Sequence, residues 1–283
     1  MNLLGVHALV WAGDWTEPSA RFAIESTREV GFDLIELALL DPAATDVAMT
    51  KRLLADNGLA VTCSLGLDQD TDVSSEDTTV VARGRDRLAA ALEVAHGIGA
   101  THLCGVLYSA LRKYSQPASP RSRENSRAAM AWLAEQTSAA GVTLALEVVN
   151  RYETNIANTA AEMLAYIDES GADIALHLDS YHMNIEENGL VEPVQQAGPR
   201  LGYLHIGESH RGYLGTGNVD FRSLFAAVRD SGYAGPVTFE SFSSAVVHPS
   251  LSNVLGVWRN LWEDSRDLAA HAHAFMAEGL APR

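Results

Sequence analysis

The chain repeats one pattern eight times: a short run of apolar, β-type residues is followed by a longer amphipathic stretch. Parallel strands need long crossover connections, and these are usually helices. Strand–helix alternation repeated eight times therefore predicts the α/β class and a closed (β/α)8 barrel, a TIM barrel, rather than an open sheet. The predicted strands are Leu3–Leu9, Phe32–Leu39, Ala60–Leu67, His102–Tyr108, Thr143–Val149, Ile174–Asp179, Leu201–Ser209 and Pro236–Phe242.

The stretches between these strands have the spacing of amphipathic helices, and glycines mark where the helices end. A glycine just after a helical pattern favours a helix stop, because glycine tolerates the left-handed conformation found there. Such glycines are Gly31, Gly58, Gly99, Gly141, Gly171 and Gly232. The predicted helices are Glu17–Val30, Val47–Asn57, Asp86–Ile98, Ser122–Ala140, Ala160–Glu169, Phe221–Ser231 and Leu251–Met276.

The length agrees with one domain. The chain has 283 residues, and a barrel of this kind takes about 250. We find no break in composition that would mark a second domain. We therefore predict a single TIM-barrel domain over residues 1–283, with the last helix, about 251–277, packing outside the barrel.

Charge and cysteine content restrict the partners. The formal net charge of −16 disfavours nucleic acid, because an acidic surface repels phosphates. No apolar run reaches the ~18 residues of a membrane helix, so we expect no membrane partner. The two cysteines lack CxxC spacing, and no basic region precedes the short apolar stretch at the N-terminus. Both features lead us to expect a cytoplasmic protein.

Four successive strands end in residues that can bind a metal ion. Glu147, Asp179, His205 and Glu240 are separated by 32, 26 and 35 residues, about one βα unit each. All four are therefore expected at the C-terminal mouth of the barrel, where such barrels build their sites. A single carboxylate at a strand end is commonly a cap or an ion-pair partner, but four in consecutive units favour a metal centre. The oxygen-rich set suits Mn²⁺, with Co²⁺ or Mg²⁺ as alternatives.

Two longer motifs make the pattern specific. Residues 146–153 read Leu-Glu-Val-Val-Asn-Arg-Tyr-Glu, and residues 179–187 read Asp-Ser-Tyr-His-Met-Asn-Ile-Glu-Glu. With His205-Ile-Gly-Glu208 and Phe239-Glu-Ser-Phe242, they resemble the ketose 3-epimerases. That family includes the D-tagatose, D-allulose and L-ribulose 3-epimerases, within the xylose-isomerase-like barrels. The resemblance extends over nearly the whole chain.

The resemblance implies an activity and a set of roles. It implies that Glu147, Asp179, His205 and Glu240 bind the metal, and that Glu147 and Glu240 also exchange the proton at C3 of a ketose. It implies sugar contacts from Glu153, His182 and Arg211, a small-molecule ketose as partner, and a homodimer or homotetramer. The proton on C3 lies next to the C2 carbonyl, so its removal gives an enediolate that a divalent cation can stabilise.

Other residues near the strand ends are candidates for the pocket. Trp15, with Trp11, follows the first strand, and either walls the pocket or packs at the barrel rim. Phe242 is expected to line the site, Glu36 to hydrogen-bond near the substrate, and His7 to take a place where related enzymes can carry an aromatic residue. His177 favours a hydrogen-bonded position inside the barrel over a ligand role.

Three alternatives remain open from the sequence. An aldose–ketose isomerase of the same superfamily, such as one acting on hydroxypyruvate, would share the metal set and the enediolate. A non-catalytic sugar-binding barrel is a second class, which the paired Glu147 and Glu240 disfavour. A phosphorylated sugar is a third; the loop Ser243–Pro249 has no glycine, lysine or arginine for a phosphate. The preferred ketose also stays open.

Overall fold

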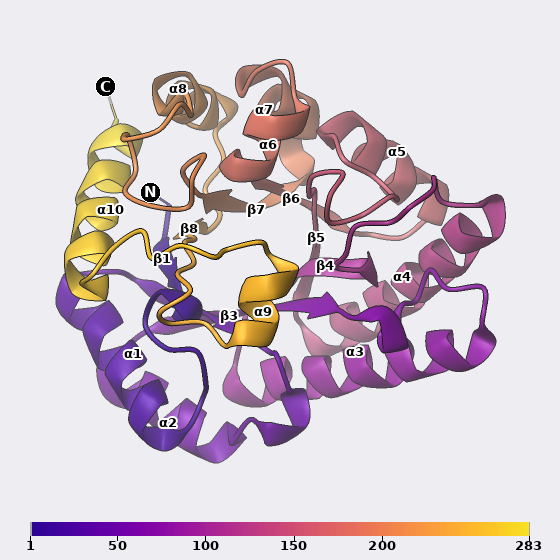
Figure 1. Ribbon diagram of the computed structural model, residues 1–283, viewed down its shortest axis with the longest axis horizontal. Coiled ribbons are helices and arrows are strands. Elements are labelled where there is room, and N and C mark those ends of the chain that lie inside the picture. Colours follow the sequence, from indigo (N-terminus) through magenta and orange to yellow (C-terminus); the bar gives the residue numbers. More distant parts are fainter. Residues whose placement is uncertain (1, 283) are drawn as a thin grey trace.

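The computed structural model describes residues 2–282 and contains a closed barrel of eight parallel strands in the order β1 to β8. Figure 1 shows the strands enclosed by helices, as the alternating sequence pattern predicted. Both the α/β class and the TIM barrel are thereby confirmed. The strands are β1 (Leu4–His7), β2 (Leu34–Ala38), β3 (Ala60–Leu67), β4 (His102–Ala110), β5 (Thr143–Glu147), β6 (Ala175–Asp179), β7 (Leu201–Ile206) and β8 (Val237–Phe239).

The helices begin and end at the expected chemical signals. The six glycines predicted to end helices all adopt positive φ angles, for example 104° at Gly31 and 70° at Gly141. Side chains cap the opposite ends of five of these six helices, as Asp46 does by accepting from Met49 N, whereas Thr16 before α1 makes no such bond. The helices that follow strands one to eight are α1 (Glu17–Val30), α2 (Val47–Asn57), α3 (Thr78–Ile98), α4 (Pro120–Ala140), α5 (Ala160–Ser170), α6 (Ser180–Glu186), α7 (Val191–Ala197), α8 (Phe221–Ser231), α9 (Pro249–Val254) and α10 (Ser265–Leu280).

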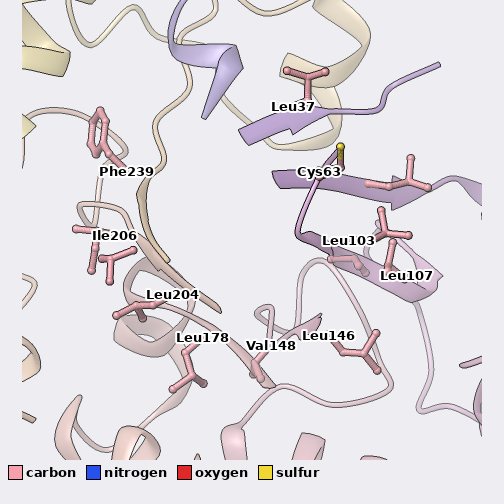
Figure 2. Packing of buried hydrophobic residues seen from close by; sticks show 14 of the residues in the cluster. Leu37, Cys63, Leu103, Leu107, Leu146, Val148, Leu178, Leu204, Ile206 and Phe239 are labelled. Carbon is pink, nitrogen blue, oxygen red and sulfur yellow. The ribbon is translucent and has the colours of Figure 1, made fainter. Parts of the chain in front are cut away.

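The main apolar core lies between the strands and the helices. Successive strand residues point to opposite faces, so Leu146 faces the helices while Glu147 faces the barrel interior. Leu204 and Ile206 flank His205 in the same way, and all three apolar residues are fully buried. Figure 2 shows such outward-facing side chains on strands all around the barrel. The interior is correspondingly polar, which brings charged groups together at its centre.

The C-terminal segment differs from the prediction. The stretch 251–277, expected as one helix, consists of α9 and α10 separated by an irregular connection. Gly256 has a φ of 66°, and Asp264 starts the second helix by accepting from Arg266 N and Asp267 N. α10 packs outside the barrel, against α1 and α8. By contrast, α9 lies across the barrel mouth in Figure 1, and its Leu251 lines a cavity there.

None of the helices within residues 2–282 combines the length and the apolar character needed to cross a bilayer.

Candidate active site

The four predicted metal ligands lie together at the C-terminal mouth of the barrel. Glu147 and Asp179 are the last residues of β5 and β6, His205 is next to the end of β7, and Glu240 follows β8 directly. His205 Nδ1 is 3.6 Å from Glu147 Oε1, 3.5 Å from Glu240 Oε1 and 4.0 Å from Asp179 Oδ2. All four side chains are buried. The strand-end spacing therefore produces one compact cluster.

The donor set of this cluster fits a divalent cation. Glu36 Oε2 accepts a hydrogen bond from His205 Nε2 at 2.8 Å, so in the neutral ring Nδ1 carries the lone pair, although the carboxylates of Glu36 and Glu240 raise the pKa of His205 while no cation is bound. Within residues 2–282, that buried Nδ1 makes no hydrogen bond, although it faces two carboxylate oxygens. An unprotonated nitrogen surrounded by carboxylates lacks a positive partner. Asp179, His205 and Glu240 can hold one ion between them, and Glu147 groups with Asp179 in the same way.

The pKa values of the cluster also favour a bound cation. Burial raises the pKa of Glu147 to about 8, and the nearby charges of Glu240 and Asp179 add to this effect. Burial likewise raises the pKa of Asp179 to about 6. Three buried carboxylates at this distance repel each other, so their charged forms need a cation. For Glu240, burial alone would raise the pKa, but the neighbouring Arg211 charge outweighs it and the pKa is lowered.

His182 is held as a neutral hydrogen-bond donor. Its Nδ1 accepts from Asn150 N at 3.2 Å and from Asn150 Nδ2 at 2.8 Å, which assigns the proton to Nε2. Burial lowers its pKa well below the usual value, so the ring stays uncharged. Its Nε2 faces Glu147 Oε1 and Asp179 Oδ2, each at 3.7 Å. His182 lies on helix α6, which begins directly after β6.

Asn150 is a site residue that sequence reasoning missed. Besides contacting His182, its side-chain amide donates to Glu153 Oε1 at 2.9 Å. One buried amide thus contacts two of the three predicted sugar-binding residues, Glu153 and His182. Burial also raises the pKa of Glu153 to about 7. The available signal was the position of Asn150 inside the strand-five motif, between Glu147 and Glu153.

Arg211 reaches the cluster from the loop after β7. It pairs with Glu240 Oε2 and lies 3.4 Å from Asp179 Oδ2. Its guanidinium stacks 3.8 Å from the ring centroid of Tyr181. With a φ of 63°, Arg211 is the one non-glycine residue with positive φ within residues 2–282. A strained backbone at such a position costs about 1–3 kcal/mol and is common at functional sites.

A cavity above the cluster has two chemically different halves. The half nearest β5 to β8 is lined by charged or ionisable side chains, namely Glu147, Glu153, His182, His205, Arg211 and Glu240. The half nearest β1 to β4 is mostly apolar and includes Leu9, Ala38, Leu40, Leu65, Val106 and Leu111. His7 and Phe242 lie at the boundary, with ring centroids 5.6 Å apart. We call this space the catalytic cavity.

Three expectations about neighbouring residues change. Glu36 does not line the catalytic cavity; it lies behind His205 and also accepts from Tyr203 Oη at 2.8 Å. Trp15 lines an adjoining cavity, where its Nε1 donates to Thr50 Oγ1 at 3.0 Å. His177 is inside the barrel as predicted, but neither ring nitrogen has a hydrogen-bond partner in the described chain. Its ring packs edge-on against His205 at 4.2 Å.

Comparison with known proteins identifies the family. The xylose isomerase-like TIM barrel model matches residues 24–277. The L-ribulose 3-epimerase of Methylomonas sp. (strain DH-1) is 57% identical over 275 residues, which cover 97% of this chain and 96% of that protein. The ketose 3-epimerase of Arthrobacter globiformis is 51% identical, with coverages of 98% and 96%.

The solved structures agree with these relatives. A crystal structure of D-allulose 3-epimerase from Methylomonas sp. in complex with D-allulose superposes with a TM-score of 0.96 at 56% identity, covering 98% of this chain and 96% of that one. The family match covers most of the chain, and the relatives align from end to end. The chain belongs to the xylose isomerase-like TIM barrel family and, within it, to the ketose 3-epimerases, which are isomerases.

Proposed function

We propose that this protein is a divalent-metal-dependent ketose 3-epimerase in which Glu147 and Glu240 exchange the proton at C3. The observation that carries the proposal is the placement of these two carboxylates. They come from β5 and β8, on either side of β6 and β7, and both lie within 3.6 Å of His205 Nδ1. Epimerisation needs one group that removes a proton and another that returns one from the opposite face.

Each residue of the cluster then has a defined task. Glu147, Asp179, His205 and Glu240 would hold the ion, for which Mn²⁺ is our first choice and Co²⁺ or Mg²⁺ the alternatives. When bound, the ion would polarise the C2 carbonyl and stabilise the charge that develops when C3 loses its proton. One glutamate takes that proton and the other returns one to the far face of the enediolate. Reversing the reaction reverses the two roles.

The remaining polar residues would orient the ketose. The Nε2–H of His182 and the guanidinium of Arg211 are donors for O1 or O2 of the sugar. Glu153 can accept from a hydroxyl group, and Asn150 keeps its carboxylate in place. Such positioning matters because a misplacement of about 1 Å can cost roughly a hundredfold in rate.

Free, unphosphorylated ketoses are the proposed substrates. Arg211 is the single arginine or lysine that lines the catalytic cavity among the described residues, and it already pairs with Glu240. A phosphate would therefore find no unpaired cation. The names of the relatives, L-ribulose 3-epimerase and D-allulose 3-epimerase, support a range that includes pentuloses and hexuloses.

The test is product analysis with the metal-loaded protein. D-Fructose, D-allulose and L-ribulose are incubated separately with enzyme and Mn²⁺, and the products are identified by chromatography. We expect C3 epimers, with deuterium entering at C3 when the reaction runs in deuterated water. Aldoses as the main products would instead indicate an aldose–ketose isomerase. Binding without any exchange would indicate a non-catalytic sugar-binding barrel.

A further inference from the structure

A second cavity adjoins the catalytic cavity on its apolar side. It has a volume of about 350 Å³ and lies between the segments that follow the neighbouring strands β1 and β2. The two cavities share the residues Leu9, Ala38 and Leu40. Ligand pockets in proteins generally occupy about 300–1,000 Å³, so this space is large enough to receive part of a ligand. We call it the tail cavity.

The polarity of the catalytic cavity directs a bound ketose toward this space. The carbonyl end of the sugar, C1 to C3, must lie against the charged half, because the two glutamates and Arg211 are there. The remaining carbons then extend toward the apolar half and the shared residues Leu9, Ala38 and Leu40. A group attached to the last carbon of a hexulose would therefore point toward the tail cavity.

The lining of the tail cavity suits a neutral sugar unit. Trp15 offers an indole whose orientation is fixed by its hydrogen bond to Thr50 Oγ1. Asp14 Oδ1 accepts from Thr16 N and Thr16 Oγ1, and Asp41 Oδ1 accepts from Ala43 N, while Oδ2 of Asp41 makes no hydrogen bond within residues 2–282. Carboxylate oxygens of this kind accept from hydroxyl groups. Among residues 2–282, no lysine or arginine lines the cavity, which disfavours a phosphate.

We propose that the tail cavity is a second sugar subsite, and that the substrates include hexuloses carrying a neutral glycosyl group on O6. This inference rests on the proposed 3-epimerase function and extends its substrate class. The reaction itself is unchanged: one C–H bond at C3 breaks, another forms on the opposite face, and the glycosidic bond stays intact.

The probe is 6-O-α-D-glucopyranosyl-D-fructose, compared with D-fructose under the same metal-loaded conditions. We expect the disaccharide to gain deuterium at C3 in deuterated water and to give its C3 epimer. The 3-O-glucosyl isomer serves as a control, since its substituent on O3 blocks the reacting carbon, and it should not react. If D-fructose is epimerised and the 6-O-glucosyl sugar is not, the subsite is wrong and the 3-epimerase function stands. If neither sugar is epimerised and other free ketoses also fail, both proposals fall.

A pair of variants tests whether the glucosyl group binds in the tail cavity. Ala44 lines the tail cavity, whereas its exposed neighbour Ala43 does not. Ala44→Trp should fill the cavity and lower the ratio of kcat/KM for the disaccharide to kcat/KM for D-fructose by at least about tenfold. Ala43→Trp should leave that ratio unchanged, and melting curves confirm that both variants are folded. An Ala44→Trp protein with the wild-type ratio would show that the glucosyl group binds elsewhere.

Discussion

At the scale of single residues, the carboxylates of Glu147 and Glu240 carry the proposed proton transfer. Replacing either by Gln removes the proton acceptor but keeps one oxygen for the metal. Net epimerisation needs both groups, so it should fall by about 10²–10⁴-fold in each variant, the usual contribution of a general acid or base. Exchange at C3 needs one group alone. Each single variant should therefore still exchange the C3 proton of one epimer, with retention of configuration, as followed by NMR in deuterated water.

Metal content must be measured alongside these rates, because both residues are also proposed ligands. A metal-replete Glu147→Gln or Glu240→Gln protein that epimerises at the wild-type rate would exclude the two-base assignment. The proton shuttle would then have to be another group at the barrel mouth.

A second residue-scale prediction concerns Glu36, which would act on the proposed metal ion through His205. Its hydrogen bond to Nε2 fixes the ring so that Nδ1 faces the cluster. Removing such a partner typically lowers metal affinity by about 10–100-fold. We expect a loss of this size for Mn²⁺ in Glu36→Gln, measured by titration calorimetry. Exposed Glu124→Gln, on helix α4, is the control and should bind Mn²⁺ like the wild type. Equal affinities in the two variants would mean that Glu36 has no part in metal binding.

The four proposed ligands could be located from the sequence because strand-end spacing is regular in a (β/α)8 barrel. Glu147, Asp179, His205 and Glu240 could thus be assigned to one mouth without knowing any distance. The contact between Glu36 and His205 joins β2 to β7 across the interior, and no local pattern encodes such a pairing. The same holds for Asn150 and His182, which are 32 residues apart. The positions of the proposed metal ligands could therefore be predicted from the sequence, whereas the hydrogen bonds that hold His205 and His182 could not.

At the scale of elements, the short helix α9 contributes to the wall of the catalytic cavity. Leu251 lines that cavity, while Val254 on the same helix is 54% exposed. Leu251→Ala removes roughly 1 kcal/mol of apolar contact, which corresponds to about a fivefold loss in kcat/KM for a hexulose. Val254→Ala is the matched control and should leave kcat/KM unchanged. Steady-state kinetics give kcat/KM for both variants. Equal kcat/KM values would show that α9 does not contact the substrate.

The boundaries of most elements followed from local chemistry. The helices α1, α2 and α8 begin and end where amphipathic spacing and a terminal glycine placed them. The break between α9 and α10 was missed because apolar residues continue through 251–276 and no proline interrupts them. Gly256 and Asp264 were the available stop and start signals. Only the structure shows that these two signals interrupt the helix, because it shows the segment crossing the barrel mouth.

At the scale of the whole molecule, negative charge is concentrated where the barrel is most buried. Glu36, Glu147, Asp179 and Glu240 lie close together in a chain whose net charge is −16. Charges taken out of water are costly unless they are paired. Glu36 is stabilised by His205 and Glu240 by Arg211, whereas the raised pKa values of Glu147 and Asp179 mean that their charged forms would gain most from a cation. The homodimer or homotetramer implied by the family resemblance stays a prediction, as does a cytoplasmic location.

This distribution of charge predicts that the metal stabilises the entire fold. An ion that binds the native state alone stabilises it by about 2.7 kcal/mol at a concentration of 100 Kd. For a chain of this size, that corresponds to a rise in Tm of roughly 5 °C. Dialysis against a chelator should therefore lower Tm and abolish epimerisation, and Mn²⁺ should restore both, as followed by calorimetry and product analysis. In His205→Asn, which loses the unpartnered Nδ1, Mn²⁺ should leave Tm nearly unchanged. Full activity in rigorously metal-free protein, or an equal rise in Tm for His205→Asn, would show that this cluster is not the metal centre.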